Sequence, residues 1–242
     1  MPQKASLTLI DQLTSRLDLQ IDGLAKKRLL MYAQLLMQGL QKQRLTGERT
    51  IEGLINKQLY DSLYPLKLIR LEETGRVFDL GSGGGLPGIP IKIYIPRIPI
   101  TLADANKRKI VFLQNTAEQL GLNRIYYINE RAETIGQDPE HRERYDYVLC
   151  RAVAQTAVLA EFTLPLLKLG GQALIYKGPR GVKEAKEADC AIKLCGGHIE
   201  KVYEYTLITG EKRSLYVIKK AGSTPSQYPR AVGKPGRKPL PG

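Results

Sequence analysis

Apolar and polar positions follow two different patterns along the chain, and the change falls near residue 76. In the first part, apolar residues recur at helical spacing, as at Leu29, Ala33 and Leu36, which predicts amphipathic helices. In the second part, short apolar runs alternate with helix-like segments, the pattern of a parallel sheet with crossover helices. We therefore predict a helical cap over residues 1–75 and an α/β domain over residues 76–220.

The strand-like runs of the second part predict a mixed sheet. Five parallel strands are expected near residues 76–80, 99–103, 124–129, 145–150 and 171–177, with helices near 87–95, 107–120, 156–168 and 182–195. Two further strand-like stretches, His198–Leu207 and Arg213–Lys219, are joined by Thr209-Gly210-Glu211 and predict a terminal antiparallel hairpin. The expected fold is thus α/β with seven strands.

The most informative stretch ends the first predicted strand, in Val77-Phe78-Asp79-Leu80-Gly81-Ser82-Gly83-Gly84-Gly85-Leu86-Pro87-Gly88. Four of the seven residues after Asp79 are glycine, and Pro87 suits the first turn of a following helix. Glycines allow positive φ and let a ligand touch the backbone, and parallel strands bind ligands at their carboxyl ends. The stretch predicts a cofactor-binding loop, and the alternative is a glycine-rich turn without a ligand.

Two cofactor classes compete for this loop. Gly83-x-Gly85-x-x-Gly88 fits the dinucleotide fingerprint. The glycines, however, begin directly after Asp79-Leu80, and acid-x-Gly-x-Gly-x-Gly resembles the first motif of class I S-adenosylmethionine-dependent methyltransferases. S-adenosylmethionine carries a sulfonium and an ammonium and no pyrophosphate, so a carboxylate beside the loop suits it better than NAD. Seven strands with a terminal hairpin also favour a Rossmann-like methyltransferase over a dehydrogenase.

Two further strand ends offer residues for such a cofactor. Asp104 closes the second strand, where its carboxylate can accept both ribose hydroxyls or can cap the helix that begins near Lys107. Arg131-Ala132-Glu133 follows the third strand, where adenine would lie, and Glu133 can equally be a surface charge.

The fourth and fifth strand ends face the transferable methyl group and the incoming substrate in this architecture. Arg151-Ala152-Val153 follows the fourth strand, and we name Arg151 as the catalytic candidate, with an ordinary ion pair as the alternative. Lys177-Gly178-Pro179 follows the fifth strand and can hold a phosphate or form a polar turn.

Net charge indicates the class of substrate. The formal net charge is +13, the sign expected of a protein that binds a polyanion. Residues 212–242 contain basic residues and no acid. Candidate RNA contacts in this region and after the fifth strand are Lys177, Arg230, Lys234, Arg237 and Lys238. Proline and glycine dominate residues 221–242, which predicts a basic tail that is extended or disordered until bound, and the alternative is a merely solvated tail.

Other classes of protein are disfavoured. The three cysteines, Cys150, Cys190 and Cys195, lack a metal-binding spacing, and we interpret them as reduced packing residues. With only two histidines in the chain, no zinc site is expected. No apolar run reaches the length of a membrane span and no signal peptide pattern begins the chain, so we expect a cytoplasmic protein.

Together these residues resemble one bacterial family, the guanine-N7 methyltransferases of small-subunit ribosomal RNA known as RsmG or glucose-inhibited division protein B. The matching stretches are residues 79–90, Asp104 with Lys107-Arg108 and Phe112-Leu113, Arg131-Ala132-Glu133, Arg151-Ala152-Val153-Ala154, Lys177-Gly178, and the tail segments 224–230, 233–235 and 238–240. The Leu86-Pro87-Gly88-Ile89-Pro90 extension is unusual among methyltransferases, and the resemblance spans about residues 30–240.

The resemblance implies a class I methyltransferase that uses S-adenosylmethionine and methylates N7 of a guanosine in the 530 loop of 16S ribosomal RNA. Its partner would be that RNA or the small ribosomal particle, and we expect a monomer. The implied cofactor contacts are Gly81, Leu86, Asp104, Ala132, Glu133 and Arg151, to which we add the neighbouring residues Asp79, Gly83, Gly85, Ala105 and Asn106. Guanine N7 already has an in-plane lone pair, so the reaction needs positioning and no general base.

The N-terminal part departs from the family pattern. Gly39-Leu40 stands where the family usually has Trp-Asn, Arg44-Leu45-Thr46 where it has Asn-Leu-Thr, and Gln58 where it has a His before Leu-Asp-Ser. These changes concern the cap, and we expect them to leave the cofactor site intact and to affect how the cap docks on RNA or on the sheet. Two other hypotheses are a methyltransferase of the same fold acting on another RNA, a small molecule or a protein, and a noncatalytic RNA-binding factor.

Overall fold

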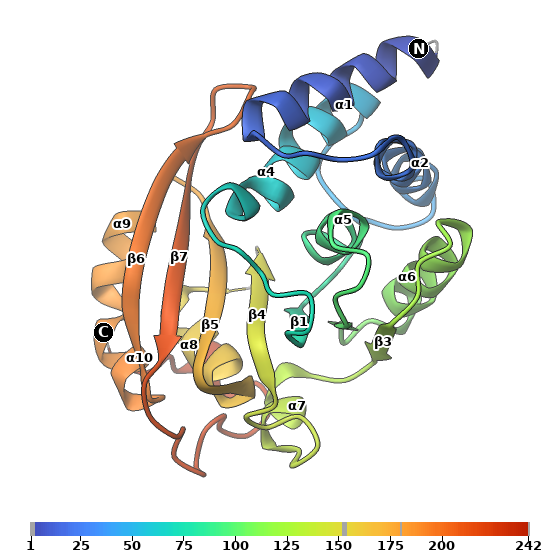
Figure 1. Cartoon of the computed structure of the whole chain (residues 1–242). Helices are drawn as coiled ribbons and strands as arrows, with labels where there is room; N and C mark the ends of the chain where they lie inside the picture. Colours follow the sequence, from blue (N-terminus) through green and yellow to red (C-terminus); the bar gives the residue numbers. More distant parts are fainter. Residues whose placement is uncertain (1–2, 152–153, 180, 242) are drawn as a thin grey trace.

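A seven-stranded mixed sheet forms the centre of the protein, with the strand order β3-β2-β1-β4-β5-β7-β6 (Figure 1). The computed structural model describes residues 3–151, 154–179 and 181–241. The strands are β1 (Val77–Leu80), β2 (Ile100–Ala103), β3 (Ile125–Ile128), β4 (Tyr145–Arg151), β5 (Leu167–Lys177), β6 (Gly197–Thr206) and β7 (Lys212–Lys220). Strands β1 to β5 are parallel, and β7 is antiparallel to both β5 and β6. The predicted sheet and terminal hairpin are confirmed.

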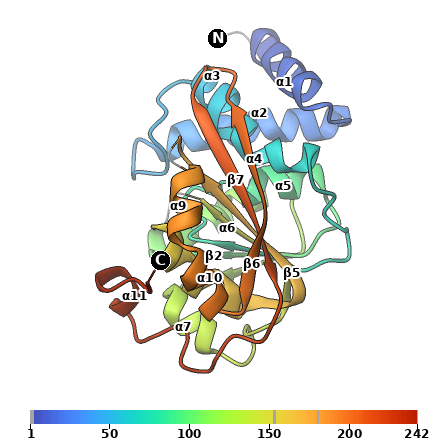
Figure 2. The same ribbon diagram turned by 90° about the vertical axis from the view of Figure 1, so that its left-hand side faces the viewer.

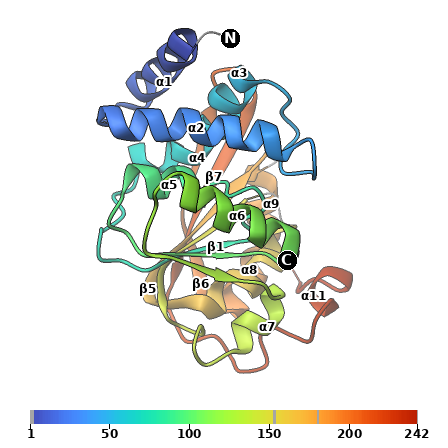
Figure 3. The same cartoon turned by 90° about the vertical axis from the view of Figure 1, so that its right-hand side faces the viewer.

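The sheet separates two apolar layers, because successive side chains of a strand point to opposite faces. In β1, Val77 packs on one face and Phe78 on the other. The N-terminal helices, α5 (Gly88–Tyr94) and α6 (Lys107–Gln119) cover the first face (Figure 3). The helices of the second face are α7 (Ala132–Gln137), α8 (Thr156–Thr163), α9 (Gly181–Glu187) and α10 (Asp189–Leu194). The carboxyl ends of the parallel strands therefore share one edge between these layers.

Most helices lie near their predicted positions, and the deviations have local causes. The helix expected over 156–168 ends at Thr163, and a 3-10 turn, Leu164–Leu166, follows because Pro165 cannot continue the α-helical hydrogen bonds. Strand β5 consequently begins at Leu167 rather than near residue 171. Helix α7 was not predicted, because its six residues are too few to show a periodicity.

The N-terminal region is helical, as predicted, and contacts both the glycine-rich loop and the terminal hairpin. Its helices are α1 (Gln3–Leu17), α2 (Gly23–Gly39), α3 (Ile51–Gly53), a π-helical segment (Leu54–Leu59), α4 (Tyr60–Leu63) and a 3-10 turn (Tyr64–Lys67). The Tyr32 hydroxyl donates to the Gly84 carbonyl at 2.7 Å. The β6–β7 hairpin reaches the cap, where Lys57 pairs with Glu211 at 2.6 Å (Figure 2). The domain boundary at residue 75 remains a prediction.

The basic tail packs on the second face of the sheet, and the expectation of an extended or disordered segment was wrong. Tyr228 and Leu240 are buried in the core of that face, and the tail includes a short helix, α11 (Lys234–Arg237). The Arg142 guanidinium donates to the Thr224 and Tyr228 carbonyls, both at 2.7 Å. Composition predicted disorder because it contains no information on tertiary contacts. In the structure, side chains distant in the sequence donate hydrogen bonds to the backbone carbonyls of the tail.

None of the helices in the described part of the chain combines the length and the apolar character needed to cross a bilayer.

The bond between Tyr32 and the glycine-rich loop predicts a measurable stability effect. Tyr32→Phe leaves the buried Gly84 carbonyl without its hydroxyl donor and should lower the free energy of unfolding by about 1 to 3 kcal/mol. Urea denaturation measures this change, with Tyr126→Phe as the control, because Tyr126 is 60% exposed on the edge strand β3. Equal stability of the two variants would contradict the proposed role of the bond.

Candidate functional site

Hydrogen bonds to β2 hold the glycine-rich loop that follows β1. The Ser82 N–H donates to the Ala103 carbonyl at 2.9 Å. The Ser82 hydroxyl donates to the Asp79 carbonyl at 2.8 Å and accepts from the Ala103 N–H at 3.1 Å. Gly81 and Gly83 adopt φ values of 71° and 57°, in the left-handed region that favours glycine. The loop therefore turns sharply at the carboxyl edge of the sheet.

Gly85 serves packing beneath this loop. A Cβ atom at this position would lie 2.6 Å from the Ile89 side chain and 2.9 Å from that of Leu113. Gly85 lines neither of the two cavities described below. Close packing thus explains why position 85 is glycine without reference to a ligand. The predicted cofactor contact at Gly85 stays a prediction.

Asp104 ends β2 with its carboxylate toward the loop. The Gly83 N–H donates to Oδ2 at 3.0 Å, and the Asn106 N–H donates to Oδ1 at 2.9 Å. The N-cap of α6 is Asn106, whose side chain accepts from the Arg108 N–H at 2.9 Å. Asp104 is therefore not the helix cap, which removes the alternative explanation for this acid.

Two cavities at this edge meet at Gly81 and Lys109, which line both. The Asp104 cavity, about 450 Å³, is bordered by Leu80, Gly81, Ala103, Asp104, Ala105, Lys109, Glu130, Arg131, Ala132, Glu133, Ala154, Val158, Phe162, Gly233 and Gly236. The Arg151 cavity, about 640 Å³, is bordered by Leu45, Thr46, Gly47, Gln58, Asp61, Gly81, Ser82, Gly83, Gly84, Leu86, Lys109, Arg151, Tyr176, Lys177, Gly178, Glu184 and Arg213. The predicted ribose and adenine residues thus line one cavity, and the predicted catalytic arginine lines the other.

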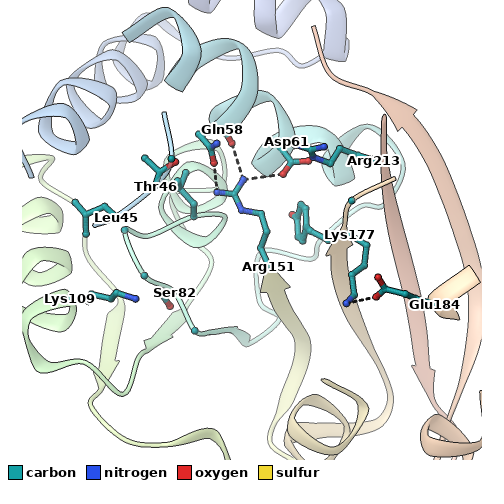
Figure 4. Close-up of a pocket in the computed structure, with 17 residues that line it drawn as sticks. Leu45, Thr46, Gln58, Asp61, Ser82, Lys109, Arg151, Lys177, Glu184 and Arg213 are labelled. Atoms are coloured by element: carbon teal, nitrogen blue, oxygen red, sulfur yellow. Dashed lines mark hydrogen bonds and ion pairs between the residues drawn. The ribbon is translucent and has the colours of Figure 1, made fainter. Parts of the chain in front are cut away.

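Arg151 extends from the end of β4 toward the helical cap (Figure 4). Its Nη1 donates to Asp61 Oδ2 at 3.1 Å and to the Gln58 carbonyl at 3.4 Å, and its Nη2 donates to Gln58 Oε1 at 2.7 Å. A guanidinium has five N–H bonds, so these contacts with the cap leave donors for a ligand. Arg151 therefore combines the two alternatives, since it lines the cavity and forms an ion pair.

Asp61 connects the cap with the terminal hairpin. Besides Arg151, it accepts from the Tyr205 hydroxyl of β6, and the Tyr205 ring stacks on Tyr64 with centroids 3.7 Å apart. Burial raises the pKa of Tyr205, and the neighbouring Asp61 carboxylate raises it further, so the phenol stays a donor. Sequence reasoning missed Asp61, because other polar residues surround it in the sequence and nothing local marks this carboxylate as buried.

Asp79 lies buried beneath the loop with one oxygen unsatisfied. Its Oδ2 accepts from the Gly88 N–H at 3.0 Å, whereas Oδ1 has no hydrogen-bond partner among the described residues. Burial raises the pKa of Asp79 to about 7, opposed by the Gly88 N–H, the Ser82 hydroxyl and the Arg151 charge. A buried acceptor without a partner is unfavourable. Asp79 lines neither cavity, so its carboxylate would favour a cationic cofactor through its charge rather than by direct contact, and the predicted cofactor contact stays a prediction.

The Arg151 cavity also contains an ion pair on its opposite wall. Lys177 Nζ, at the end of β5, lies 2.8 Å from Glu184 Oε2 of α9 and donates to the Ala154 carbonyl at 2.8 Å (Figure 4). Lys177 thus lines the cavity, beside an acid that sequence reasoning did not single out, and the predicted RNA contact at Lys177 stays a prediction. Charge patterning could not reveal Glu184, because α9 carries acids and bases on several sides.

Glu133 borders the Asp104 cavity and is not a surface charge. Its side chain is only 4% exposed, and Oε2 lies 3.8 Å from Arg131 Nε. Its Oε1 accepts from the Gly233 N–H of the tail at 2.8 Å. The tail therefore reaches the predicted adenine region, which sequence reasoning did not anticipate.

The remaining predicted residues lie in three places. Ala152 and Val153 of the Arg151 motif fall outside the described residues. Arg230 forms an ion pair with Glu161 at 2.7 Å, so its guanidinium holds the tail. Lys234, Arg237 and Lys238 are exposed on the tail, outside both cavities.

Comparison with known proteins identifies the family. The profile described as rRNA small subunit methyltransferase G matches residues 25–215. The chain belongs to this family. A relative from Pelotomaculum thermopropionicum, named ribosomal RNA small subunit methyltransferase G, is 45% identical over 197 residues, 81% of each chain. One of the same name from Desulforamulus reducens is 43% identical over 210 residues, 86% of this chain and 88% of the relative. The predicted S-adenosylmethionine-dependent methyltransferase is thereby confirmed.

Solved structures confirm the class I methyltransferase fold. A fibrillarin/Nop5p complex matches with a TM-score of 0.54 at 14% identity, covering 68% of this chain and 83% of that chain. A ribosomal protein L11 methylase from Lactobacillus delbrueckii matches with a TM-score of 0.52 at 13% identity, covering 73% and 81%. At such identities the similarity concerns the fold alone.

The raised pKa of Asp79 predicts a pH-dependent stability difference. Because the pKa is about 7 in the folded protein and ordinarily 3.8, the folded state binds an extra proton between these values, so stability falls as pH rises through this range. Asp79→Asn removes this pH-dependent loss of stability, because an amide does not titrate in this range. In the cofactor-free protein the variant should gain about 2 to 3 kcal/mol relative to wild type between pH 5 and pH 8.

Chemical denaturation of both proteins at the two pH values measures this gain. Calorimetry at pH 8 supplies the second readout, since the variant should bind S-adenosylmethionine more weakly despite its greater stability. A stability difference that is the same at pH 5 and pH 8 would show that Asp79 does not titrate in this range.

Proposed function

We propose that the protein transfers a methyl group from S-adenosylmethionine to N7 of a guanosine in the 530 loop of 16S ribosomal RNA. The observation that carries this proposal is the meeting of the Asp104 and Arg151 cavities at Gly81. One cavity offers groups for an adenosine, the other offers groups for a base, and the loop between them is where the transferable methyl group would lie. Membership of the small-subunit ribosomal RNA methyltransferase G family supports the RNA and the reaction class.

The cofactor would be held by groups around the Asp104 cavity. Asp104 offers a carboxylate for the ribose hydroxyls, and Ala132 and Glu133 border the space for adenine. The unsatisfied Oδ1 of Asp79 supplies negative charge near the loop for a cationic group. Bound S-adenosylmethionine supplies an electrophilic methyl group on a sulfonium.

The ion pair of Lys177 and Glu184 supports guanine as the base. The guanine Watson–Crick edge presents the O6 acceptor beside the N1–H and N2–H donors. A lysine donor next to a carboxylate acceptor, 2.8 Å apart, complements that order, with Lys177 toward O6 and Glu184 toward N1 and N2. Adenine would place its N1 acceptor against the carboxylate. Recognition through this edge leaves N7 free.

The contacts of the two carboxylates that line the Arg151 cavity agree with N7 as the nucleophile. Asp61 accepts from Arg151 and Tyr205, and Glu184 pairs with Lys177. Both carboxylates are engaged in these contacts, and attack by an aromatic lone pair requires no general base. Arg151, fixed by Gln58 and Asp61, would orient the base through O6 or a phosphate and would not bind N7.

The proposed substrate determines the partner and compartment. We propose that the enzyme acts in the cytoplasm on the small ribosomal particle, which a 16S RNA substrate supports, and that it is a monomer, because one chain contains both cavities. The net charge of +13 favours binding to RNA phosphates.

The position of the methyl group is the direct test of this function. N7-methylguanosine carries a fixed positive charge, so borohydride and aniline should cleave the methylated 16S RNA at a single guanosine of the 530 loop. Small ribosomal particles from a strain lacking the gene, methylated by the purified enzyme, provide the substrate, and unmethylated particles are the control. Label found on a base carbon, a ribose or a protein would overturn the proposal.

The guanine-reading role of Glu184 makes a second prediction. Glu184→Gln should lower kcat/KM by about 5 to 150-fold, the equivalent of one bidentate base contact at about 1 to 3 kcal/mol, while cofactor affinity stays unchanged. Glu187→Gln is the matched control, because Glu187 lies on the same helix, pairs with Lys183 and has a side chain that is 60% exposed. Equal activity of the two variants would exclude Glu184 from base recognition.

A further inference from the structure

The tail forms part of the wall of the Asp104 cavity. Gly233, the N-cap of α11, and Gly236, within that helix, border this cavity together with Asp104 and Glu133. Gly233 adopts a φ of 78° and donates its N–H to Glu133 Oε1 at 2.8 Å. The space proposed for adenine is therefore enclosed by the sheet edge on one side and by tail backbone on the other.

Several side chains of the α/β domain fix the tail in this position. Arg230 donates Nε to Oε1 of Glu161 at 2.9 Å and Nη2 to Oε2 at 2.7 Å, and Glu161 is fully buried on α8. Gln137, at the end of α7, donates to the Ser226 and Pro229 carbonyls at 3.1 and 2.7 Å. Figure 3 shows α11 beside α7 at the edge of the second layer. The approach of the tail is thus built into the domain.

The outer surface of this wall is basic. Lys234, Arg237 and Lys238 are exposed, and residues 212–242 contain no acid. Three cations within five residues form a surface suited to phosphate groups. The same short turn therefore presents backbone to the cofactor cavity and positive charge to solvent.

We propose that the tail couples RNA binding to cofactor binding. RNA phosphates that bind Lys234 and Lys238 further stabilise α11 in its observed position, where Gly233 already donates to Glu133, and so stabilise the wall of the Asp104 cavity around the cofactor. This inference rests on the proposed function for the identity of the RNA, but the coupling concerns the cofactor site alone. By linkage, RNA must tighten cofactor binding by the same factor by which cofactor tightens RNA binding.

The first test asks whether the tail is a wall of the cofactor cavity. Gly233→Ala forces a side chain onto a residue with a φ of 78° and should weaken binding of S-adenosylhomocysteine several-fold, measured by calorimetry on the full chain. Gly210→Ala is the matched control, because Gly210 has a φ of 94° with open space around it and lies in the β6–β7 hairpin, away from the cavity. The control should keep wild-type affinity. Wild-type affinity in Gly233→Ala as well would overturn the proposal.

The second test measures the coupling itself. Small ribosomal subunits that lack the methyl group should tighten S-adenosylhomocysteine binding to the wild-type protein by about 5 to 10-fold, a typical allosteric factor. Lys234→Gln/Lys238→Gln should keep the affinity of the free protein and lose this enhancement. Arg70→Gln/Arg97→Gln removes the same charge from side chains that are 90% and 82% exposed and lie outside both cavities, and it should keep the enhancement.

The outcomes separate this proposal from the proposed function. Wild-type protein that methylates its guanosine but binds the cofactor equally with and without subunits would overturn the coupling and leave the function intact. An enhancement that both double variants lose would assign it to net charge rather than to the tail, and would also overturn the proposal.

Discussion

The ion pair between Arg151 and Asp61 determines how the helical cap sits over the site. Both side chains are largely buried, 13% and 8% exposed, and their charged atoms are 3.1 Å apart. Such a pair tolerates burial only if its remaining polar atoms find partners, which Gln58 and Tyr205 supply here. Because Arg151 ends β4, Asp61 lies on α4 and Tyr205 lies on β6, one network joins the cap, the parallel strands and the terminal hairpin. The Arg151 cavity exists because these three parts are held together around it.

The same arrangement explains why an acid can remain under the glycine-rich loop. Asp79 is buried, and burial favours its neutral form, but the Gly88 N–H and the Arg151 charge oppose that shift. The pKa of the Asp79 carboxyl therefore stays at about 7, from which a nearby cationic ligand can lower it and ionise the group. The glycines of the loop have two functions. Gly81 and Gly83 expose backbone at the cavities. At Gly85 and Gly88 a Cβ atom would clash with neighbouring side chains, namely those of Ile89, Leu113 and Asp79.

The sequence predicted the elements whose signals are local and missed those that depend on distant contacts. The strands, the loop after Asp79 and the place of Asp104 after β2 follow from apolar runs, glycine spacing and position at a strand end. Asp61 could not be placed beside Arg151, because 90 residues separate them, and Gly233 lies 100 residues from Glu133. The ordered tail was missed for the same reason, since its composition predicts disorder and its partner Glu161 lies on α8.

We propose that cofactor and base approach Gly81 from opposite cavities, and a crystal structure of the protein with S-adenosylhomocysteine tests this arrangement most directly. We expect ribose hydroxyls within hydrogen-bond distance of the Asp104 carboxylate, adenine between Ala132 and the Gly233 backbone, and the sulfur at Gly81 facing the Arg151 cavity. A ligand whose sulfur faces away from Arg151, or whose adenosine occupies the Arg151 cavity, would exclude this arrangement.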